Sequence, residues 1–425
     1  MQNFIYVEII LLFMEYYPRI IEEDLEQWIN RREVVLIKGP RQSGKTTLFL
    51  HLNEKLNGNY VTLEDDEILT VFENNPKLFI KRFGDKKFLF IDEAQYSKNI
   101  GKIIKLIFDM YPNLKIFATG SGSFDVKVQI GKYLVGRAVY FELFPLNFEE
   151  FILWKDKSLH SIFKDYQNTV IDFVKGEKIS ISEKDISFIR DFKDLLEEYV
   201  IFGGFPAIVK EDDPDIKKQL LKNLYRTYLE KDVFFFFNIR HLEKFRAFLK
   251  YLSFTNGCLL ELSKVSKDLG IDYKTLDNYL NILVNTYVIS TVNPFHRNLV
   301  TELRKTRKFY FVDSGLRNAI LGNFNSIEKR TDKGNLLENF IYNEIKKFGD
   351  IKYWRTTGKA EIDFILLYND EIIPIEVKSF RDIERGFLSF LKTYKPKRAL
   401  VFTEKNFGIK RVERTEILYL PHWFI

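Results

Sequence analysis

The chain has 425 residues, of which 46% are hydrophobic and 29% charged, and a formal net charge of +6. This balance is ordinary for a globular protein and argues against a disordered chain or a membrane bundle, and the length predicts two to four domains. The only cysteine, Cys258, excludes an intramolecular disulfide and a thiolate zinc site. It favours a reducing, cytoplasmic location, and we expect no membrane partner.

The N-terminal segment 4–14 is apolar but contains Glu8, and it is too short to span a bilayer. It lacks the basic start and the small-residue cleavage site of a signal peptide. We expect either an extra helix here or translation that begins at Met14.

Residues 34–52 contain the clearest motif of the sequence. A β-branched run leads into a Gly-x-x-x-x-Gly-Lys-Thr loop and then into an amphipathic helix, which is the context that a phosphate-binding loop requires. Backbone N–H groups and the helix N-terminus face the phosphates; Lys45 reaches the β- and γ-phosphates, and Thr46 offers its hydroxyl to Mg²⁺. The predicted nucleotide-binding residues are Gly39, Pro40, Arg41, Gln42, Ser43, Gly44, Lys45, Thr46 and Thr47.

Residues 86–95 supply the acidic element that should accompany such a loop. An apolar strand ends there in Asp92 and Glu93. Asp92 is predicted to lie beside Thr46 and to hold the metal through water, and Glu93 to orient and polarise the attacking water.

A further apolar strand, within residues 114–123, ends in small polar residues. Thr119 or Ser121 is expected to sense the γ-phosphate, and we favour Ser121. The alternation of strands and helices predicts an α/β fold with a parallel sheet and the nucleotide at its carboxyl edge.

The chain resembles a group of prokaryotic AAA+ ATPases in the segments GPRQSGKTT, LFIDEAQ, TGSGS, LVGRAVYFELFPLNFEEF and FGGFPAI. In that group a C-terminal half of unknown function follows the ATPase module. The resemblance covers the chain from about Met14 and implies an ATPase core at residues 1–150 that uses ATP and Mg²⁺, with a homo-oligomer as one option. AAA+ proteins often place an arginine on the γ-phosphate, and Arg137 is the candidate; a surface salt bridge is the alternative.

Residues 151–237 are predicted to form a helical lid, in which no chemistry is readable. The Gly203-Gly204 pair and Pro206 mark a turn after a helix. The run 234–237 is four phenylalanines, interpreted as core.

Residues 238–325 are predicted to form a winged-helix domain. One helix ends at Gly270, and Asp272 caps a second helix. Two β-like runs follow, at 288–292 and 308–312. The apolar stripe of the second helix is Leu276, Leu280, Leu283 and Val284, and Lys274, Thr275, Asn278 and Asn281 lie away from it.

This region holds twice as many basic as acidic residues between positions 240 and 310. Arg304, Lys305, Arg307 and Lys308 are placed where a wing touches backbone phosphates, so DNA is the predicted partner. Protein docking is the alternative, because winged helices also serve that purpose.

A charged hairpin lies near the C-terminus. Its turn is expected at 369–370, a pair that tolerates positive φ. Strand pairing then sets Asp363 opposite Glu376, and it sets Glu361 opposite Lys378 on the same face. Because like charges at this separation repel, we expect a divalent cation, Mg²⁺ or Mn²⁺, between the two carboxylates. The other face is predicted to pack on helices: Ile362, Phe364, Leu366, Ile373, Ile375 and Val377.

The helix predicted at 332–349 brings Glu338 toward the same site, and Lys378 is expected to position or activate a water. The set Glu338, Asp363, Glu376 and Lys378 resembles the PD-(D/E)xK nuclease fold, with Ile362 in place of the motif's proline. This nuclease-like domain is assigned to residues 326–425. The alternative is a solvent-facing hairpin edge with two salt bridges and no metal.

The sequence therefore predicts a Mg²⁺-dependent AAA+ ATPase that couples ATP binding and hydrolysis to nucleic-acid binding or processing. Its C-terminal domain is nuclease-like, and whether it cleaves is left open. The alternative function is a nucleotide-driven switch whose C-terminal half docks protein partners without cleavage.

Overall fold

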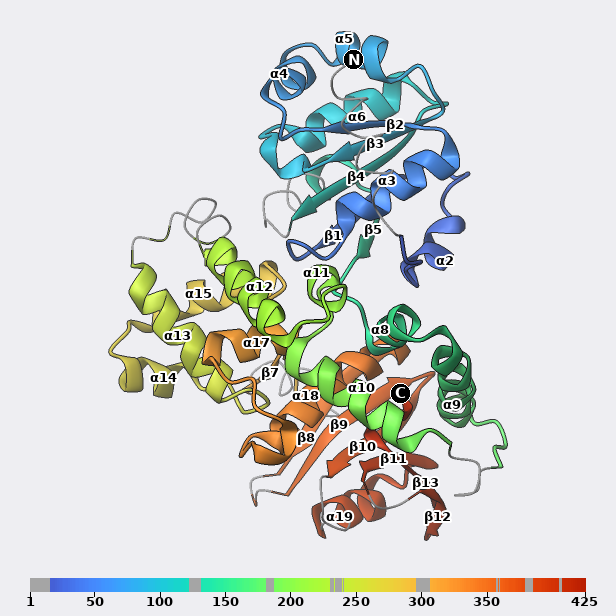
Figure 1. Ribbon diagram of the computed structural model, residues 1–425, viewed down its shortest axis with the longest axis vertical. Helices are drawn as coiled ribbons and strands as arrows, with labels where there is room; N and C mark the ends of the chain where they lie inside the picture. The colour runs from blue at the N-terminus through green and yellow to red at the C-terminus, as the bar shows by residue number, and fades with distance from the viewer. Residues whose placement is uncertain are drawn as a thin grey trace. The chain divides into compact units, whose positions relative to one another are not determined.

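The computed structural model describes residues 16–121, 131–180, 187–229, 233, 239, 241–295, 306–356, 358, 360–378, 385–404 and 407–425. The predictions for segments 4–14 and 234–237, and for Arg304 and Lys305, lie outside these residues. The fold is α/β, as predicted, and forms two compact units (Figure 1). Unit 1 is Met1–Leu146 with Asn285–Tyr287, and unit 2 is Asn147–Val284 with Val288–Ile425.

Within the described ranges, no helix combines the length and the hydropathy that crossing a bilayer requires.

Unit 1 is a five-stranded parallel sheet in the order β2-β3-β4-β1-β5, with helices on its faces (Figure 1). The parallel sheet was predicted. Its strands are β1 (Val34–Gly39), β2 (Asn59–Thr62), β3 (Phe88–Asp92), β4 (Lys115–Ser121) and β5 (Ala138–Glu142). Its helices are α2 (Ile21–Glu26), α3 (Lys45–Leu56), α4 (Asp66–Asn74), α5 (Pro76–Phe83) and α6 (Ile100–Met110).

The central strands of unit 1 are buried on both faces. Val35 of β1 packs into one apolar cluster with Phe49 of α3, whereas Leu36 packs into another with Ile104 of α6. This explains why β1 and β3 read as continuous apolar runs rather than as alternating ones.

The helices of the region predicted as a lid belong to unit 2. They are α8 (Phe148–Lys155), α9 (Lys157–Lys175), α10 (Ile189–Phe202), α11 (Pro206–Val209) and α12 (Pro214–Thr227). Phe148 packs edge-on against Phe340 of α18 (Lys333–Ile345) at 5.2 Å, and Trp423 stacks on Phe192 at 4.8 Å. The helical structure is confirmed, and these contacts join the helices to the C-terminal part; a lid role remains a prediction.

The next part of unit 2 contains three helices and a two-stranded antiparallel ladder. They are α13 (Leu242–Phe254), α14 (Leu262–Leu269), α15 (Tyr273–Asn285), β6 (Ile289–Val292) and β7 (Lys308–Phe311), followed by α17 (Ser314–Leu321). The predicted cap is confirmed, because the Thr275 N–H donates to Asp272 Oδ2 at 3.2 Å. The predicted apolar stripe of α15 is also confirmed, since all four of its residues pack into one core cluster.

The C-terminal part is a mixed six-stranded sheet in the order β12-β13-β11-β10-β9-β8. Helix α18 packs on β9 and β10, and α19 packs on β9. The elements are β8 (Asp350–Arg355), β9 (Glu361–Tyr368), β10 (Glu371–Lys378), α19 (Arg385–Tyr394), β11 (Arg398–Thr403), β12 (Gly408–Val412), β13 (Thr415–Leu420) and the short 3₁₀ helix η6 (His422–Phe424).

The Gly203-Gly204 turn is shaped by a buried carboxylate far along the chain. Asp313 caps α17 by accepting from the Leu316 N–H at 2.8 Å, and it also accepts from the Gly204 N–H at 2.8 Å. A Cβ on Gly203, whose φ is +76°, would meet the Asp313 carboxylate oxygens at 2.3 Å. Burial raises the pKa of Asp313 to about 6.

Glu344 of α18 is a buried acid with few compensating partners. One of its oxygens accepts from the Phe148 N–H at 3.1 Å, and Oε2 has no hydrogen-bond partner among the described residues. Burial therefore raises the pKa of Glu344 from 4.5 to about 7.

Replacing Glu344 by Gln should stabilise unit 2 most at alkaline pH. The folded state holds a proton on Glu344 up to about pH 7, so its contribution to stability is fully present below about 4.5 and is lost as the pH rises through 7. We expect the urea midpoint of Glu344→Gln to exceed that of the wild type at pH 8, and the gap to narrow at pH 5. A gap independent of pH, or one equal to that of the exposed control Glu416→Gln, would contradict this assignment.

Candidate nucleotide site and C-terminal charged site

The phosphate-binding loop joins β1 to α3. Gln42 and Gly44 adopt left-handed backbone conformations, with φ of 61° and 97°, which let the loop curl around the start of α3. Lys45 is buried, and its ammonium donates to the carbonyls of Gly39 at 3.0 Å and Pro40 at 2.7 Å. The strand–loop–helix arrangement predicted for this segment is therefore confirmed.

The loop is held in place by close packing at Gly39 and by hydrogen bonds from Arg19. A Cβ on Gly39 would lie 2.0 Å from the Leu143 carbonyl oxygen, so only glycine fits there. The Arg19 guanidinium donates to the Ser43 carbonyl at 2.9 Å and to the Phe144 carbonyl at 2.7 Å. Arg19 was not predicted from the sequence, because no local pattern links it to the loop.

Asp92, at the carboxyl end of β3, is the centre of the site. Its carboxylate accepts from Thr46 Oγ1 at 2.7 Å, from the Tyr60 hydroxyl at 2.9 Å and from the Thr119 hydroxyl. The Glu93 N–H adds a fourth bond at 3.0 Å. The structure thus brings Thr46 beside Asp92, and the carboxylate is almost fully buried.

Glu93 has a strained backbone, with φ of +55°, which is unusual for a residue with a side chain. Its carboxylate accepts a hydrogen bond from the Gln95 amide. Burial, and then the nearby Asp92 carboxylate, raise the pKa of Glu93, while Lys45 opposes that shift. A carboxylate of raised basicity beside the phosphate-binding loop suits a residue that accepts a proton or orients a water.

The oxygens of Thr46 and Asp92 fit a Mg²⁺ ion, which prefers hydroxyl, carboxylate and water ligands. Tyr60 was missed by the sequence analysis, because β2 lies beside β3 only in the folded sheet. Thr119, the alternative to Ser121, is the β4 residue that contacts Asp92. The backbone of Ser121 pairs with Gly39, and its side chain lies outside the described residues.

Arg137 lies at the opposite edge of the sheet from the loop. It precedes Ala138, which pairs with Val34 at the start of β1, whereas the loop begins after Gly39. Six strand residues separate these edges by roughly 17 Å, so Arg137 does not reach a γ-phosphate bound to its own chain. Its guanidinium contacts Asp109 at 3.5 Å, which is the salt-bridge alternative; action on a second copy remains a prediction.

The C-terminal hairpin has the predicted register near its turn. Asn369 and Asp370 both have positive φ, and pairing runs from Glu371 opposite Tyr368 to Ile375 opposite Phe364. Beyond that point β9 bulges. Between Lys352 and Trp354 its partner β8 advances two residues, while β9 advances three, from Ile365 to Ile362.

The bulge overturns the prediction that all four charged residues share one face. Phe364 packs against Tyr342 of α18, so its partner Ile375 lies on the α18 face and Glu376 on the other. Ile362 belongs to the α19 cluster, so Ile362 and Phe364 do not share a face, and Glu361, the neighbour of Ile362, lies on the face opposite to Glu376. Asp363 and Glu376 still approach each other, with the Asp363 N–H 3.5 Å from Glu376 Oε2.

Asp363 fills a gap in the β9–β10 ladder. Its Oδ2 accepts from the Val377 N–H at 2.8 Å, in place of a backbone carbonyl. Burial, and then Glu376, raise the pKa of Asp363 well above its usual value. Glu376 contacts the Lys378 ammonium at 2.7 Å.

The prediction that Lys308 contacts backbone phosphates from a wing is wrong. It is buried rather than exposed to a phosphate backbone, and its ammonium lies 3.1 Å from Glu338 and 2.6 Å from Glu361. Glu338 also accepts from the Tyr310 hydroxyl. Burial alone would lower the pKa of Lys308, but Glu338, then Asp363 and Glu361, raise it above its ordinary value.

The second divalent cation is not supported. Among the described residues no group of three or more acids, histidines or cysteines is arranged to hold a metal. Glu338 is instead engaged by Lys308, while Lys378 contacts Glu376. Two ammonium groups thus supply the positive charge that the sequence argument assigned to a metal.

Comparisons with known proteins match three segments of the chain. An AAA domain matches residues 31–152, and domains of unknown function match residues 193–327 (DUF8612) and 333–423 (DUF4143). An uncharacterized protein of Haemophilus influenzae is 25% identical, over 95% of this chain and 98% of its own. One of Methanocaldococcus jannaschii is 26% identical, over 84% and 77%. The solved Thermotoga maritima RuvB Holliday junction branch migration motor gives a TM-score of 0.30 at 18% identity, over 64% of this chain and 88% of that one.

Replacing Lys308 by Met should destabilise unit 2 by about 1–3 kcal/mol, because it removes the buried ammonium that pairs with the partly buried carboxylates of Glu338 and Glu361. Adding Glu338→Gln should recover part of that loss. Urea unfolding of the single and double variants measures both effects, with Lys392→Met on the exposed face of α19 as the control. A single variant as stable as this control would contradict the role of Lys308.

Proposed function

Because this chain belongs to the prokaryotic AAA+ ATPases that carry a C-terminal DUF4143 domain, we propose that it binds and hydrolyses ATP with Mg²⁺ and uses turnover to control nucleic-acid binding or processing by its C-terminal half. A cytoplasmic location is part of this proposal. The observation that carries it is the convergence of Lys45, Thr46, Asp92 and Glu93 at the carboxyl edge of one parallel sheet.

Each of these residues has a distinct task. The loop N–H groups and Lys45 bind the phosphates and neutralise their charge. Thr46 and Asp92 hold the metal, directly or through water, and the bound Mg²⁺ supplies charge neutralisation at the β- and γ-phosphates. Glu93, tethered by Gln95, orients the attacking water and accepts its proton. Thr119 links β4 to Asp92 and so connects the strand next to the loop to the metal ligand.

Contact with nucleic acid is supported by the surface of α15. Lys274, Asn278 and Asn281 are exposed, while the apolar stripe of the same helix is packed into the core. Cationic and amide side chains on an exposed helix face suit contacts to phosphates and to base edges.

Lys45→Ala should abolish ATP turnover, because it removes the cation that faces the β- and γ-phosphates. Glu93→Gln should retain ATP binding and lower turnover by roughly 10²–10⁴-fold, because only the proton acceptor is lost. Phosphate release and binding of a fluorescent ATP analogue separate the two effects. Wild-type turnover in either variant would refute the assignment of this site.

Two functions compete for the C-terminal charged site. Cleavage of nucleic acid is supported by Asp363, Glu376 and Lys378, which come together at adjoining strands as acids and a lysine do in nucleases of this type. The ion pairs of Lys308 and Lys378 with the acids weigh against metal-dependent cleavage, and the alternative is that the C-terminal half docks protein partners without cleavage.

A nuclease assay with Asp363→Ala and Glu376→Ala decides between them. If the site cleaves, purified wild type should cut plasmid or single-stranded DNA with Mg²⁺ or Mn²⁺ but not with Ca²⁺ or EDTA, and both variants should lose cutting while keeping ATP turnover. DNA left intact by the wild type under every metal, with and without ATP, favours docking without cleavage.

A further inference from the structure

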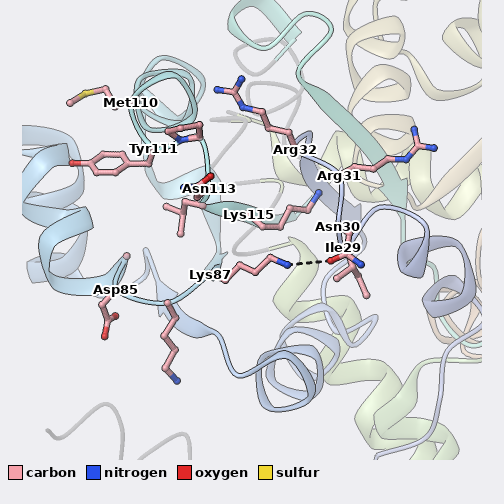
Figure 2. Close-up of a pocket in the computed structure, with 14 residues that line it drawn as sticks. Ile29, Asn30, Arg31, Arg32, Asp85, Lys87, Met110, Tyr111, Asn113 and Lys115 are labelled. Atoms are coloured by element: carbon pink, nitrogen blue, oxygen red, sulfur yellow. Dashed lines mark hydrogen bonds between the residues drawn. The ribbon is translucent and has the colours of Figure 1, made fainter.

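The edge of the unit 1 sheet opposite the nucleotide site contains a second recess. The segments that lead into β1, β3 and β4 line a pocket of about 710 Å³, formed by residues 29–32, 84–87 and 110–115 (Figure 2). Parallel strands all begin at one edge of their sheet, so these segments necessarily meet there. Nothing in the ATPase chemistry uses this edge.

The pocket is strongly basic. Its lining contains five cations, Arg31, Arg32, Lys86, Lys87 and Lys115, and a single acid, Asp85. None of the five forms an ion pair with a carboxylate of a described residue. The Asp85 carboxylate is itself engaged, because it accepts from the Asn59 amide at 2.5 Å.

The cations are held by neutral partners instead. Lys87 Nζ donates to Asn30 Oδ1 at 3.2 Å, and Arg32 donates to the Phe108 carbonyl at 3.1 Å and lies over its ring at 4.3 Å. Arg31 lies over the Trp28 ring at 4.8 Å. These contacts orient the side chains without neutralising their charge, so the pocket keeps a positive potential that favours an anionic ligand.

Lys115 is the most buried cation of the pocket. It is 4% exposed, yet its ammonium has only the Glu33 carbonyl, at 2.5 Å, as a hydrogen-bond partner among the described residues. Burial lowers the pKa of Lys115 to about 8, despite the opposing charge of the Glu33 side chain. A negatively charged ligand would favour the charged form of this ammonium and so offset the cost of its burial.

The distribution of the cations favours an extended anion over a single phosphate. The exposed ones, Arg31, Arg32 and Lys87, come from two separate segments of the lining, and the buried Lys115 comes from a third. Figure 2 shows Lys87 and Lys115 reaching toward Asn30, while Arg31 and Arg32 extend from the neighbouring backbone. A chain of phosphates meets such an arrangement along its length, whereas one phosphate engages only part of it.

We propose that this pocket binds the phosphate backbone of a nucleic acid, at the edge of the ATPase sheet opposite ATP. The inference deepens the nucleic-acid part of the proposed function and rests on it. The strands that leave the pocket, β1, β3 and β4, carry Gly39, Asp92 and Thr119 toward their other ends. The proposed nucleic-acid site and the nucleotide site therefore lie at opposite ends of the same three strands.

The test compares two double variants of the full chain. Arg31→Ala/Lys87→Ala removes two exposed pocket cations, and Lys77→Ala/Lys102→Ala removes two exposed cations of unit 1 outside it. Fluorescence anisotropy measures affinity for labelled single-stranded DNA, duplex DNA and RNA at several salt concentrations. We expect the pocket variant to bind at least tenfold more weakly. The slope of the logarithm of the binding constant against the logarithm of the salt concentration should become shallower by about two, because each phosphate contact contributes about one. The control and the basal ATP turnover should be unchanged.

Two results would overturn the proposal, and they differ in what they imply. Equal binding by both double variants and the wild type places the backbone contact elsewhere, and a loss in Lys274→Ala would then locate it on α15. No binding by the wild type to any of the three nucleic acids removes the nucleic-acid part of the proposed function as well. ATP turnover, measured in the same preparations, stays an independent test of the nucleotide site.

Discussion

A carboxylate taken out of water must meet hydrogen-bond donors or a positive charge, and this constraint shapes both units. In unit 1 the buried Asp92 is satisfied by three hydroxyls and a backbone N–H. In unit 2 the partly buried carboxylates of Glu338 and Glu361 pair with the buried ammonium of Lys308. Similar acid-rich stretches of sequence therefore lead to different electrostatics. Hydroxyl groups donate to the acid of the nucleotide site, whereas lysine ammonium groups pair with the acids of the C-terminal charged site.

The parts of the fold that sequence predicts well are those set by neighbours along the chain. The phosphate-binding loop follows from glycine spacing between a strand and a helix, and the hairpin turn at 369–370 from two residues that accept positive φ. The cap at Asp272 is equally local. The AAA and DUF4143 matches confirm the family resemblance.

What sequence does not predict depends on which segments meet in space. Tyr60 reaches Asp92 only because β2 lies beside β3, and Lys308 reaches Glu338 across 30 residues. The bulge in β9 can be recognised only from its pairing with β8, yet it places Glu361 and Glu376 on opposite faces of the sheet. Strict alternation was the reasonable assumption, and one extra residue was enough to invalidate it.

The contact between Asp313 and the 203–204 turn has a consequence for how unit 2 assembles. One carboxylate both caps α17 and anchors a turn 109 residues earlier in the chain. The Gly204 N–H has this acceptor only when α17 is packed against the turn. A side chain on Gly203 would clash with the Asp313 carboxylate, so glycine is needed for that packing. Local helix formation and long-range docking thus become a single cooperative event, in which the two segments open and close together.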